Sequence, residues 1–303
     1  MKKILLLLFT AAVFAGLPAA HSQTDSTAKP AFKRTEDVLY GRKFGTALTL
    51  DVFEPREKNG AAILFMVSGG FFSSHEAINA KMYAPFLERG YTVFAIVHGS
   101  QPKFQIPEIT EDIHRAVRFV RHNAKRWGVD PEKFGITGGS AGGHLSLTMG
   151  TQGKPGKADA KDPVDRVSST VQAVACFFPP TDFLNYGEAG EDAVGIGTLQ
   201  QFKPAFGAKS DTAAGRQALG REISPINFIT SNMPPTLIIH GDADKLVPLY
   251  QAQRFGARCK EAGAPFKLIT KPGVAHGWAG MEKDYVFLAD WFDEHLRGLK
   301  SKR

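Results

Sequence analysis

The stretch KFGITGGSAGGHLSLTMG, residues 133–150, decides the fold. Its first part, Phe134–Gly138, is a short apolar run typical of a buried parallel strand. Its second part, Ala141–Met149, places small and apolar residues on one face of a helix. Ser140 lies between them with a pair of glycines close on either side, which a tight and strained strand-to-helix turn requires. The pattern predicts a serine hydroxyl held at the carboxyl edge of a sheet.

The G-x-S-x-G pattern alone is weak, because glycine and serine are common in loops. Its surroundings strengthen it, since buried strands and helices alternate along the chain and so predict a mostly parallel sheet with right-handed crossovers. An outer antiparallel strand is expected at Thr46–Phe53. The expected core strands are Ala61–Val67, Tyr91–Val97, Phe134–Gly138, Val171–Phe178, Pro235–His240 and Phe266–Lys271, and the expected helices are Ala80–Arg89, Glu108–Trp127, Ala141–Met149, Tyr250–Ala262 and Asp284–Leu296.

Residues 1–22 read as a signal peptide of the Sec type. Two lysines are followed by the apolar run Ile4–Gly16, which is short for a membrane span, and small residues precede Gln23. We expect cleavage before Gln23 and a periplasmic or secreted protein. A retained membrane anchor is the alternative interpretation.

The remaining chain reads as one domain with an insertion. Residues 23–36 are polar and predict a flexible leader, and residues 37–303 are expected to form the folded domain. Residues 179–233 lack a sustained strand pattern and are too many for an ordinary connection between core strands. They predict a small helical cap over the carboxyl edge of the sheet, or else a surface excursion unrelated to substrate.

The charge and cysteine content exclude some classes of protein. The chain has 303 residues and a formal net charge of +7, but no basic cluster alternates with aromatic residues as a nucleic-acid surface would require. None of the nine histidines pairs with acids at a metal-site spacing, so neither metal nor cofactor is expected. Cys176 lies in an apolar run and reads as a core residue, although an exported protein could pair it with Cys259.

Three polar residues follow three predicted core strands, in the order Ser140, Asp244 and His276. The carboxyl ends of parallel strands share one edge of a sheet, so these side chains can meet there. A serine needs a base to take its proton, and the base needs an acid to orient it and offset its charge. The order serine, acid, histidine is that of one known triad arrangement.

The stretch Ser68–Phe72, SGGFF, follows a predicted central strand. Its two glycines let the backbone turn N–H groups inward, as the stabilisation of a developing oxyanion requires. A plain tight turn is the alternative.

The motifs GGSAGG at 138–143, HGDADKLVP at 240–248 and AHGW at 275–278 together resemble those of α/β-hydrolases. The chain is most similar to the esterase and lipase group that includes feruloyl and acetyl-xylan esterases, and to the related prolyl oligopeptidase-like enzymes. The resemblance covers the core from about Thr46 to the end. It implies a mostly parallel eight-stranded sheet flanked by helices, with a small helical cap.

The resemblance implies Ser140 as nucleophile, Asp244 as orienting acid and His276 as general base. The family pattern H-G-x-x-D selects Asp244 in preference to Asp242. His144 and His240 lie beside the motifs and read as structural.

The resemblance also implies an oxyanion hole made by the N–H of Ala141 and that of Gly70 or Phe71. Relatives often carry His-Gly-Gly-Gly or His-Gly-Gly-Pro where this chain reads Ser68-Gly69-Gly70-Phe71. Which N–H completes the hole with Ala141 therefore stays open.

Aromatic and imidazole side chains near the predicted edge are candidates for substrate contact. Phe72, His98 and Trp278 are expected to line a pocket, although a histidine like His98 more often forms loop hydrogen bonds. Four aromatic residues of the predicted cap could bind an aromatic acyl group or, as we expect, form the core of the cap. They are Phe183, Tyr186, Phe202 and Phe206.

The sequence thus predicts an exported serine esterase, a carboxylic-ester hydrolase that works through an acyl-enzyme. Its expected partners are short-chain or aryl esters, as small molecules or as acyl groups on plant polysaccharides. Neither nucleic acid nor a stable membrane anchor is expected, and the oligomeric state is open. The alternatives are a prolyl oligopeptidase-like peptidase and a non-catalytic ligand-binding protein of the same fold.

Overall fold

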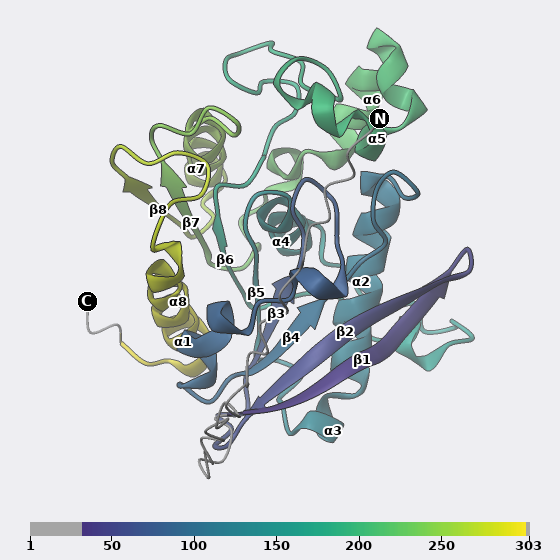
Figure 1. Cartoon of the computed structure of the whole chain (residues 1–303), viewed down its shortest axis with the longest axis vertical. Helices are drawn as coiled ribbons and strands as arrows, with labels where there is room; N and C mark the ends of the chain where they lie inside the picture. Colours follow the sequence, from purple (N-terminus) through teal and green to yellow (C-terminus); the bar gives the residue numbers. More distant parts are fainter. Residues whose placement is uncertain (1–31, 301–303) are drawn as a thin grey trace, which may run out of the picture. The chain divides into compact units, whose positions relative to one another are not determined.

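Within the described residues, 32–300, eight strands form one sheet in the order β1-β2-β4-β3-β5-β6-β7-β8 of this computed structural model (Figure 1). β1 and β2 are antiparallel to each other, β2 is antiparallel to β4, and the remaining neighbours are parallel. The predicted fold class is therefore confirmed. The strands are β1 Phe32–Lys43, β2 Thr46–Pro55, β3 Ala62–Met66, β4 Thr92–Ile96, β5 Phe134–Thr137, β6 Ala173–Phe177, β7 Thr236–Gly241 and β8 Phe266–Lys271.

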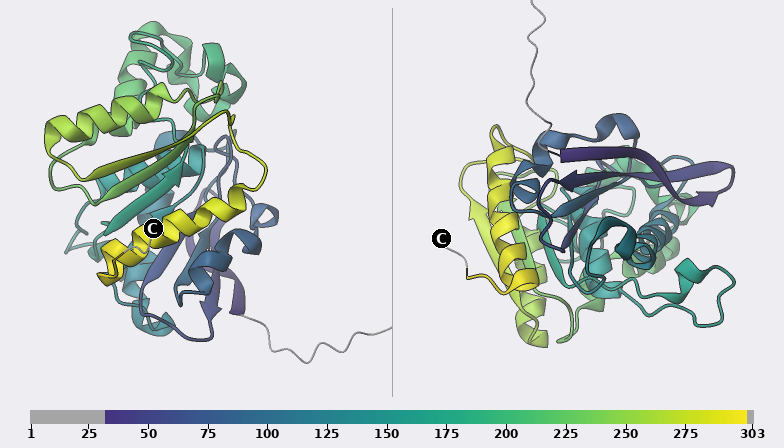
Figure 2. Two further views of the ribbon diagram at one scale, coloured as in Figure 1. Left: turned by 90° about the vertical axis from the view of Figure 1, so that its left-hand side faces the viewer. Right: turned by 90° about the horizontal axis from the view of Figure 1, so that it is seen from below.

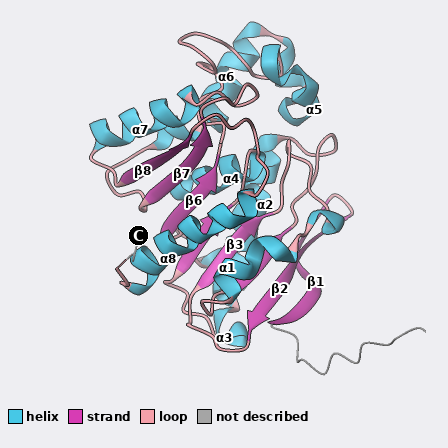
Figure 3. Ribbon diagram, turned by 60° about the vertical axis from the view of Figure 1, so that its left-hand side comes forward, coloured by secondary structure: helices cyan, strands magenta, loops and turns pink. Residues whose placement is uncertain are grey.

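Helices cover both faces of this sheet, and α8 crosses one of them (Figures 2 and 3). The α-helices of the described region are α1 Ala84–Leu87, α2 Ile106–His122, α3 Ala124–Trp127, α4 Ala141–Gln152, α5 Lys203–Phe206, α6 Ala213–Ile223, α7 Tyr250–Ala262 and α8 Tyr285–Arg297. Its 3-10 helices outside the cap are η1 His75–Ala77, η2 Ala80–Tyr83, η3 Pro163–Arg166 and η7 Met281–Asp284.

The alternation of side chains along β3 builds two hydrophobic layers. Leu64 and Met66 belong to the cluster that includes residues of α2, α4 and α7, whereas Ile63 and Phe65 belong to the cluster with α1 and α8. All four are buried. Burying one such side chain contributes about 1.5–3 kcal/mol, so both faces of the central strands are strongly held. The loops at the carboxyl edge therefore start from fixed points.

The predicted flexible leader over residues 23–36 is wrong in its last part. Phe32 opens β1, and Arg34 donates to the buried carboxylate of Asp51 on β2. β1 is an edge strand with many half-buried or exposed positions, so its polar composition resembled that of a leader. The signal peptide predicted at 1–22 and the first part of the leader lie outside the described residues.

Two predicted helices are less regular than expected. Residues 80–89 form the 3-10 helix η2 followed by the short α1, rather than one α-helix. The helix predicted at Glu108–Trp127 divides at Asn123, whose side-chain amide donates to the carbonyl oxygen of Phe119. This hydrogen bond gives a carbonyl in the last turn of α2 a side-chain donor, and such bonds compete with the backbone bonds that would continue a helix.

The segment predicted as a cap consists of short helices without a named strand in residues 179–233, all of which are described. Figure 1 shows α5 and α6 beyond the carboxyl ends of the strands. Phe183, Tyr186 and Phe206 are fully buried, as expected for the core of a cap, whereas Phe202 is only half-buried. The cap also contains the 3-10 helices η4 Gly197–Phe202, η5 Ala208–Asp211 and η6 Pro225–Phe228.

None of the helices within residues 32–300 has the length and apolar character needed to span a bilayer.

Buried histidines make the fold sensitive to acid. Burial lowers the pKa of His98 and of His144 to about 4. The unfolded chain would protonate both near the ordinary value of about 6.5, so it binds more protons than the folded chain between these values. Stability therefore falls as pH drops from 6.5 towards 4, by about 2 kcal/mol per histidine at pH 5.

We expect His144→Asn to reduce this acid sensitivity, because asparagine cannot titrate and its amide can still donate to the Pro180 carbonyl that His144 contacts. The measurement is urea unfolding at pH 7.5 and pH 5. The loss of unfolding free energy between the two should be about 2 kcal/mol smaller than in wild type. The exposed His122 supplies the control, since His122→Asn should leave the loss unchanged. Equal losses in all three proteins would contradict the assignment.

Candidate active site

Ser140 sits on a sharp turn between β5 and α4. Its φ of 54° and ψ of −120° lie outside the regions that L-residues normally occupy, and such strain concentrates at functional sites. A Cβ atom at Gly138 would lie 2.6 Å from the backbone of Gly142, and one at Gly142 would lie 2.8 Å from the Met66 carbonyl oxygen. Glycine is therefore required at both positions to let strand, turn and helix approach one another.

The structure brings Ser140, His276 and Asp244 together in one hydrogen-bonded line. The Oγ of Ser140 lies 2.9 Å from Nε2 of His276, and Nδ1 of His276 lies 2.7 Å from Oδ2 of Asp244. The three residues come from the loops after β5, β8 and β7, as the parallel strand order predicts. The predicted meeting at one sheet edge is therefore seen, although their chemical roles remain predictions.

The surroundings of Asp244 fix the proton positions in this line. The N–H groups of Leu246 and Val247 both donate to its Oδ1, at 3.0 and 2.9 Å. Burial acts to raise the pKa of Asp244, but hydrogen bonds from His240, His276 and the Val247 N–H outweigh it and hold that pKa well below its usual range. The ionised carboxylate of Asp244 accepts a hydrogen bond from the Nδ1–H group of His276. The Nε2 lone pair of a neutral His276 is then free to accept the Ser140 hydroxyl proton.

Three backbone N–H groups next to Ser140 have no acceptor among the described residues: those of Gly70, Phe71 and Ala141. Ala141 opens the twelve-residue helix α4, whose dipole favours negative charge at this end. Gly70 and Phe71 both have positive φ, 54° and 65°. All three residues border Ser140, so their N–H groups can stabilise an anion that forms beside its hydroxyl.

Gln101 fixes the orientation of the Gly70–Phe71 loop. Its buried side-chain amide donates to the Gly70 carbonyl, and its backbone N–H donates to the Phe71 carbonyl at 3.2 Å. In a planar trans peptide the C=O and N–H point in opposite directions, so the N–H of Phe71 points away from Gln101. The N–H of Gly70 is fixed likewise, because the Phe72 N–H donates to the carbonyl of Gly69 at 2.9 Å. No motif in the sequence pointed to this role of Gln101.

Two cavities meet at Ser140. The larger, about 500 Å³, includes His276 in its lining, and the smaller, about 20 Å³, includes Phe71 and Ala141 but not His276. Phe202 lines both, so this cap aromatic faces the site instead of belonging only to the cap core. Met281 and Tyr285 also line the larger cavity, and neither of them was singled out from the sequence.

The residues predicted to contact substrate are placed differently. Phe72 is 53% exposed and lies outside the lining of either cavity. His98 is buried, and its ring nitrogens contact the Gly99 carbonyl at 2.7 Å and the Ser68 hydroxyl at 2.8 Å. His98 therefore forms loop hydrogen bonds, which was the alternative interpretation of this residue, and does not line the pocket.

Trp278 likewise lies behind the site. Its Nε1–H donates to Asp284 at 2.7 Å, and its ring packs on Phe178, which contacts the ring of His276. Trp278 thus supports the wall of the larger cavity and does not line it.

One group of side chains has the ligand spacing of a metal site. Glu36, Asp51 and His75 place ligand atoms within 4.8 Å of one another. The guanidinium of Arg34, however, already pairs with Asp51 and with Glu36. The positive charge of Arg34 thus offsets the charge of these carboxylates. The three residues therefore fit an ion-pair network better than a metal site.

A model of the BD-FAE family matches residues 50–258, which is more than half of the chain. Among curated proteins, the chain is 29% identical over 245 residues to Esterase LipQ of Mycobacterium tuberculosis, covering 76% of this chain and 54% of LipQ. It is 28% identical to the probable carboxylic ester hydrolase LipM of the same organism, covering 72% of this chain and 50% of LipM. The chain thus spans about half the length of these relatives.

Solved structures are similar over nearly their whole length. A truncated form of a carbohydrate esterase from gut microbiota has a TM-score of 0.74 and 28% identity, covering 89% of this chain and 99% of that one. Esterase 2 of Thermogutta terrifontis, phosphonylated by sarin, has a TM-score of 0.68 and 26% identity, covering 86% of this chain and 94% of that one.

Proposed function

Because the chain belongs to the BD-FAE family, we propose that it is a serine esterase that hydrolyses carboxylic esters through an acyl-enzyme. The observation that carries this proposal is the unbroken line from Ser140 through His276 to Asp244, at 2.9 and 2.7 Å. The similar proteins named esterases support the same reaction class. A binding protein would need no such line.

In the proposed reaction, Ser140 Oγ bonds to the ester carbonyl carbon as its proton passes to His276 Nε2. The N–H groups beside Ser140 stabilise the negative charge that develops on the carbonyl oxygen. The ester C–O bond then breaks, and His276 gives its proton to the leaving alcohol. In the second half, His276 takes a proton from water, the water oxygen bonds to the acyl carbon, and Ser140 recovers its proton as the acid leaves.

We expect Gln101→Ala to slow this reaction without weakening substrate binding. The variant removes the side-chain bond to Gly70 but keeps the backbone bond to Phe71, so the peptide that carries the Phe71 N–H loses one of its anchors. Losing an oxyanion donor outright costs about 10²–10³ in kcat, so a loosened donor should cost about 10- to 100-fold.

The measurement is kcat and KM for p-nitrophenyl acetate at pH 7.5, with Ser100→Ala as the control. Ser100 lies in the same loop, but its hydroxyl contacts the Ser73 N–H and the Gln101 carbonyl, not Gly70 or Phe71. A rise in KM at constant kcat for Gln101→Ala, or equal losses in both variants, would exclude a role for Gln101 in orienting the hole.

We further propose that residues 1–22 export the protein, which would give it access to acylated glycans outside the cell. The basic start, apolar run and small residues before Gln23 support this. The mass of the protein recovered from the periplasm or medium of an expressing bacterium should match a chain that begins at Gln23. Recovery only in the cytoplasm, with residues 1–22 retained, would contradict export.

A further inference from the structure

The two cavities at Ser140 differ in size, and only the larger of the two is lined by the general base, His276. Gly70, Ser140, Phe202 and Leu246 line both, so these residues stand at the junction. The ring of Phe202 presses on the Gly70 loop, since a Cβ atom at Gly70 would lie 2.5 Å from it. Phe202 thus closes the gap between the cap and the loop that carries the free N–H groups.

The chemistry of ester cleavage decides which part of the substrate enters each cavity. Once the carbonyl oxygen faces the free N–H groups, the acyl chain and the alcohol leave the carbonyl carbon in two different directions. The alcohol oxygen must lie near His276, because this residue protonates it as it leaves. The large cavity, lined by His276, therefore takes the alcohol, and the small one takes the acyl chain.

Resting on the proposed esterase function, we propose that the small cavity is the acyl site, that it restricts the enzyme to acetyl esters of bulky alcohols, and that Phe202 sets this limit. A cavity of about 20 Å³ has room for about one water-sized group, because one water needs about 10–15 Å³ by the same measure. The methyl of an acetyl group is of this size. A feruloyl group is far larger, so this geometry predicts that feruloyl esters are poor substrates.

The walls of the acyl site leave little room for adjustment. Phe71, Tyr186 and Phe206 line it and are buried, and the Tyr186 hydroxyl donates to the Leu246 carbonyl at 2.9 Å. This bond satisfies the only polar atom of Tyr186 that could otherwise enter the site. The site therefore presents apolar surface to an acyl chain, apart from Ser140 and the N–H groups.

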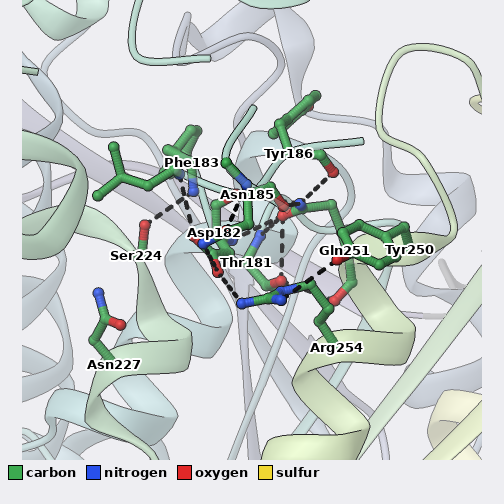
Figure 4. Close-up of polar contacts among 12 residues, drawn as sticks. Thr181, Asp182, Phe183, Asn185, Tyr186, Ser224, Asn227, Tyr250, Gln251 and Arg254 are labelled. Carbon is green, nitrogen blue, oxygen red and sulfur yellow. Dashed lines mark hydrogen bonds and ion pairs between the residues drawn. The ribbon is translucent and has the colours of Figure 1, made fainter. Parts of the chain in front are cut away.

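Gln251 of α7 anchors the cap segment that carries Tyr186 (Figure 4). Its fully buried amide accepts from the N–H of Thr181 and Asp182, at 2.7 and 2.8 Å. It donates to the carbonyls of Asp182, Asn185 and Tyr186, at 3.1, 2.9 and 2.6 Å. These contacts to one buried side chain hold this wall in place, so enlarging the site requires changing a side chain.

Phe202 is the side chain to change, because it is half-buried and ends η4 instead of filling the cap core. Phe202→Ala should join the two cavities and admit longer acyl chains. The measurement is kcat/KM for p-nitrophenyl acetate, butyrate and hexanoate, in which the alcohol stays constant. Wild type should prefer acetate to hexanoate by at least tenfold, and Phe202→Ala should shift this ratio towards hexanoate by at least tenfold. Phe202→Leu should shift it in the same direction by less.

Met281→Ala is the matched control, because Met281 lines only the large cavity and its loss should leave the acyl preference unchanged. A second comparison reverses the ester: 4-methylumbelliferyl acetate has a bulky alcohol and methyl ferulate a bulky acyl group. Wild type should hydrolyse the first at least a hundredfold better. Thermal unfolding of each variant shows whether the cap remains folded.

Two failures are distinguishable. If wild type hydrolyses hexanoate or methyl ferulate as well as acetate, the acyl-site proposal is overturned while the esterase function stands. The same holds if Met281→Ala shifts the preference as much as folded Phe202→Ala does. If wild type hydrolyses no ester and a fluorophosphonate leaves Ser140 unmodified, the esterase function itself fails, and the acyl-site proposal fails with it.

Discussion

Ser140→Ala will lower kcat for p-nitrophenyl acetate by about 10⁴- to 10⁶-fold and leave the fold intact. The expected loss is this large because the variant removes the atom that forms the acyl-enzyme. His276 and Asp244 cannot act separately, since both serve the Ser140 hydroxyl. The residual rate reflects water attack assisted by the N–H groups of the site.

Ser146 supplies the matched control, because it is a buried serine of α4, the helix that follows Ser140, and its hydroxyl donates to the Gly142 carbonyl at 2.8 Å. Ser146→Ala should retain kcat within about threefold, since the Ser146 hydroxyl donates within α4 and not to Ser140 or His276. Full activity of Ser140→Ala, measured after a purification that excludes contaminating esterases, would refute a serine mechanism at this site.

Asp244→Asn will lower kcat by about 10⁴-fold, by holding His276 in the wrong tautomer. In the native chain, Oδ1 of Asp244 accepts from the N–H groups of Leu246 and Val247. An asparagine side chain must place its carbonyl oxygen there, which turns its NH₂ group towards Nδ1 of His276. His276 then accepts at Nδ1 and carries its proton on Nε2, where it cannot take the proton of Ser140.

Asp242 offers a matched control two residues away. It is exposed, and its carboxylate accepts from the Gly273 N–H at 2.7 Å. Asp242→Asn should keep kcat within about threefold, because an amide oxygen can accept the same bond. A large loss in Asp242→Asn with near-normal Asp244→Asn would mean that the acid of the line was wrongly assigned.

The sequence predicted the site best where backbone geometry dictates residue type. Gly138 and Gly142 are required beside Ser140 because an added Cβ atom would lie 2.6 and 2.8 Å from backbone atoms, so these glycines mark the turn in the sequence. The order of Ser140, Asp244 and His276 after three parallel strands was enough to predict their meeting. Strand and helix patterns likewise fixed α7 and β8 to the residue, because their apolar positions are regular.

The sequence could not predict features that depend on tertiary contacts. Phe32–Glu36 looked like a polar leader because an edge strand buries few side chains. Gln101 lies in an irregular loop, and only its contacts with Gly70 and Phe71 reveal its position behind the N–H groups. His98 and Trp278 follow strand ends as pocket residues do, yet their hydrogen bonds turn them away from the cavities.

The most direct test of the account is the mass of the intact protein after reaction with a fluorophosphonate, for wild type and Ser140→Ala. The account predicts one adduct per wild-type molecule, located at Ser140 by peptide mapping and formed in step with the loss of ester hydrolysis. Ser140→Ala should gain no adduct. An unmodified wild type that still hydrolyses esters, or an adduct at another residue whose formation abolishes activity, would contradict the central claim.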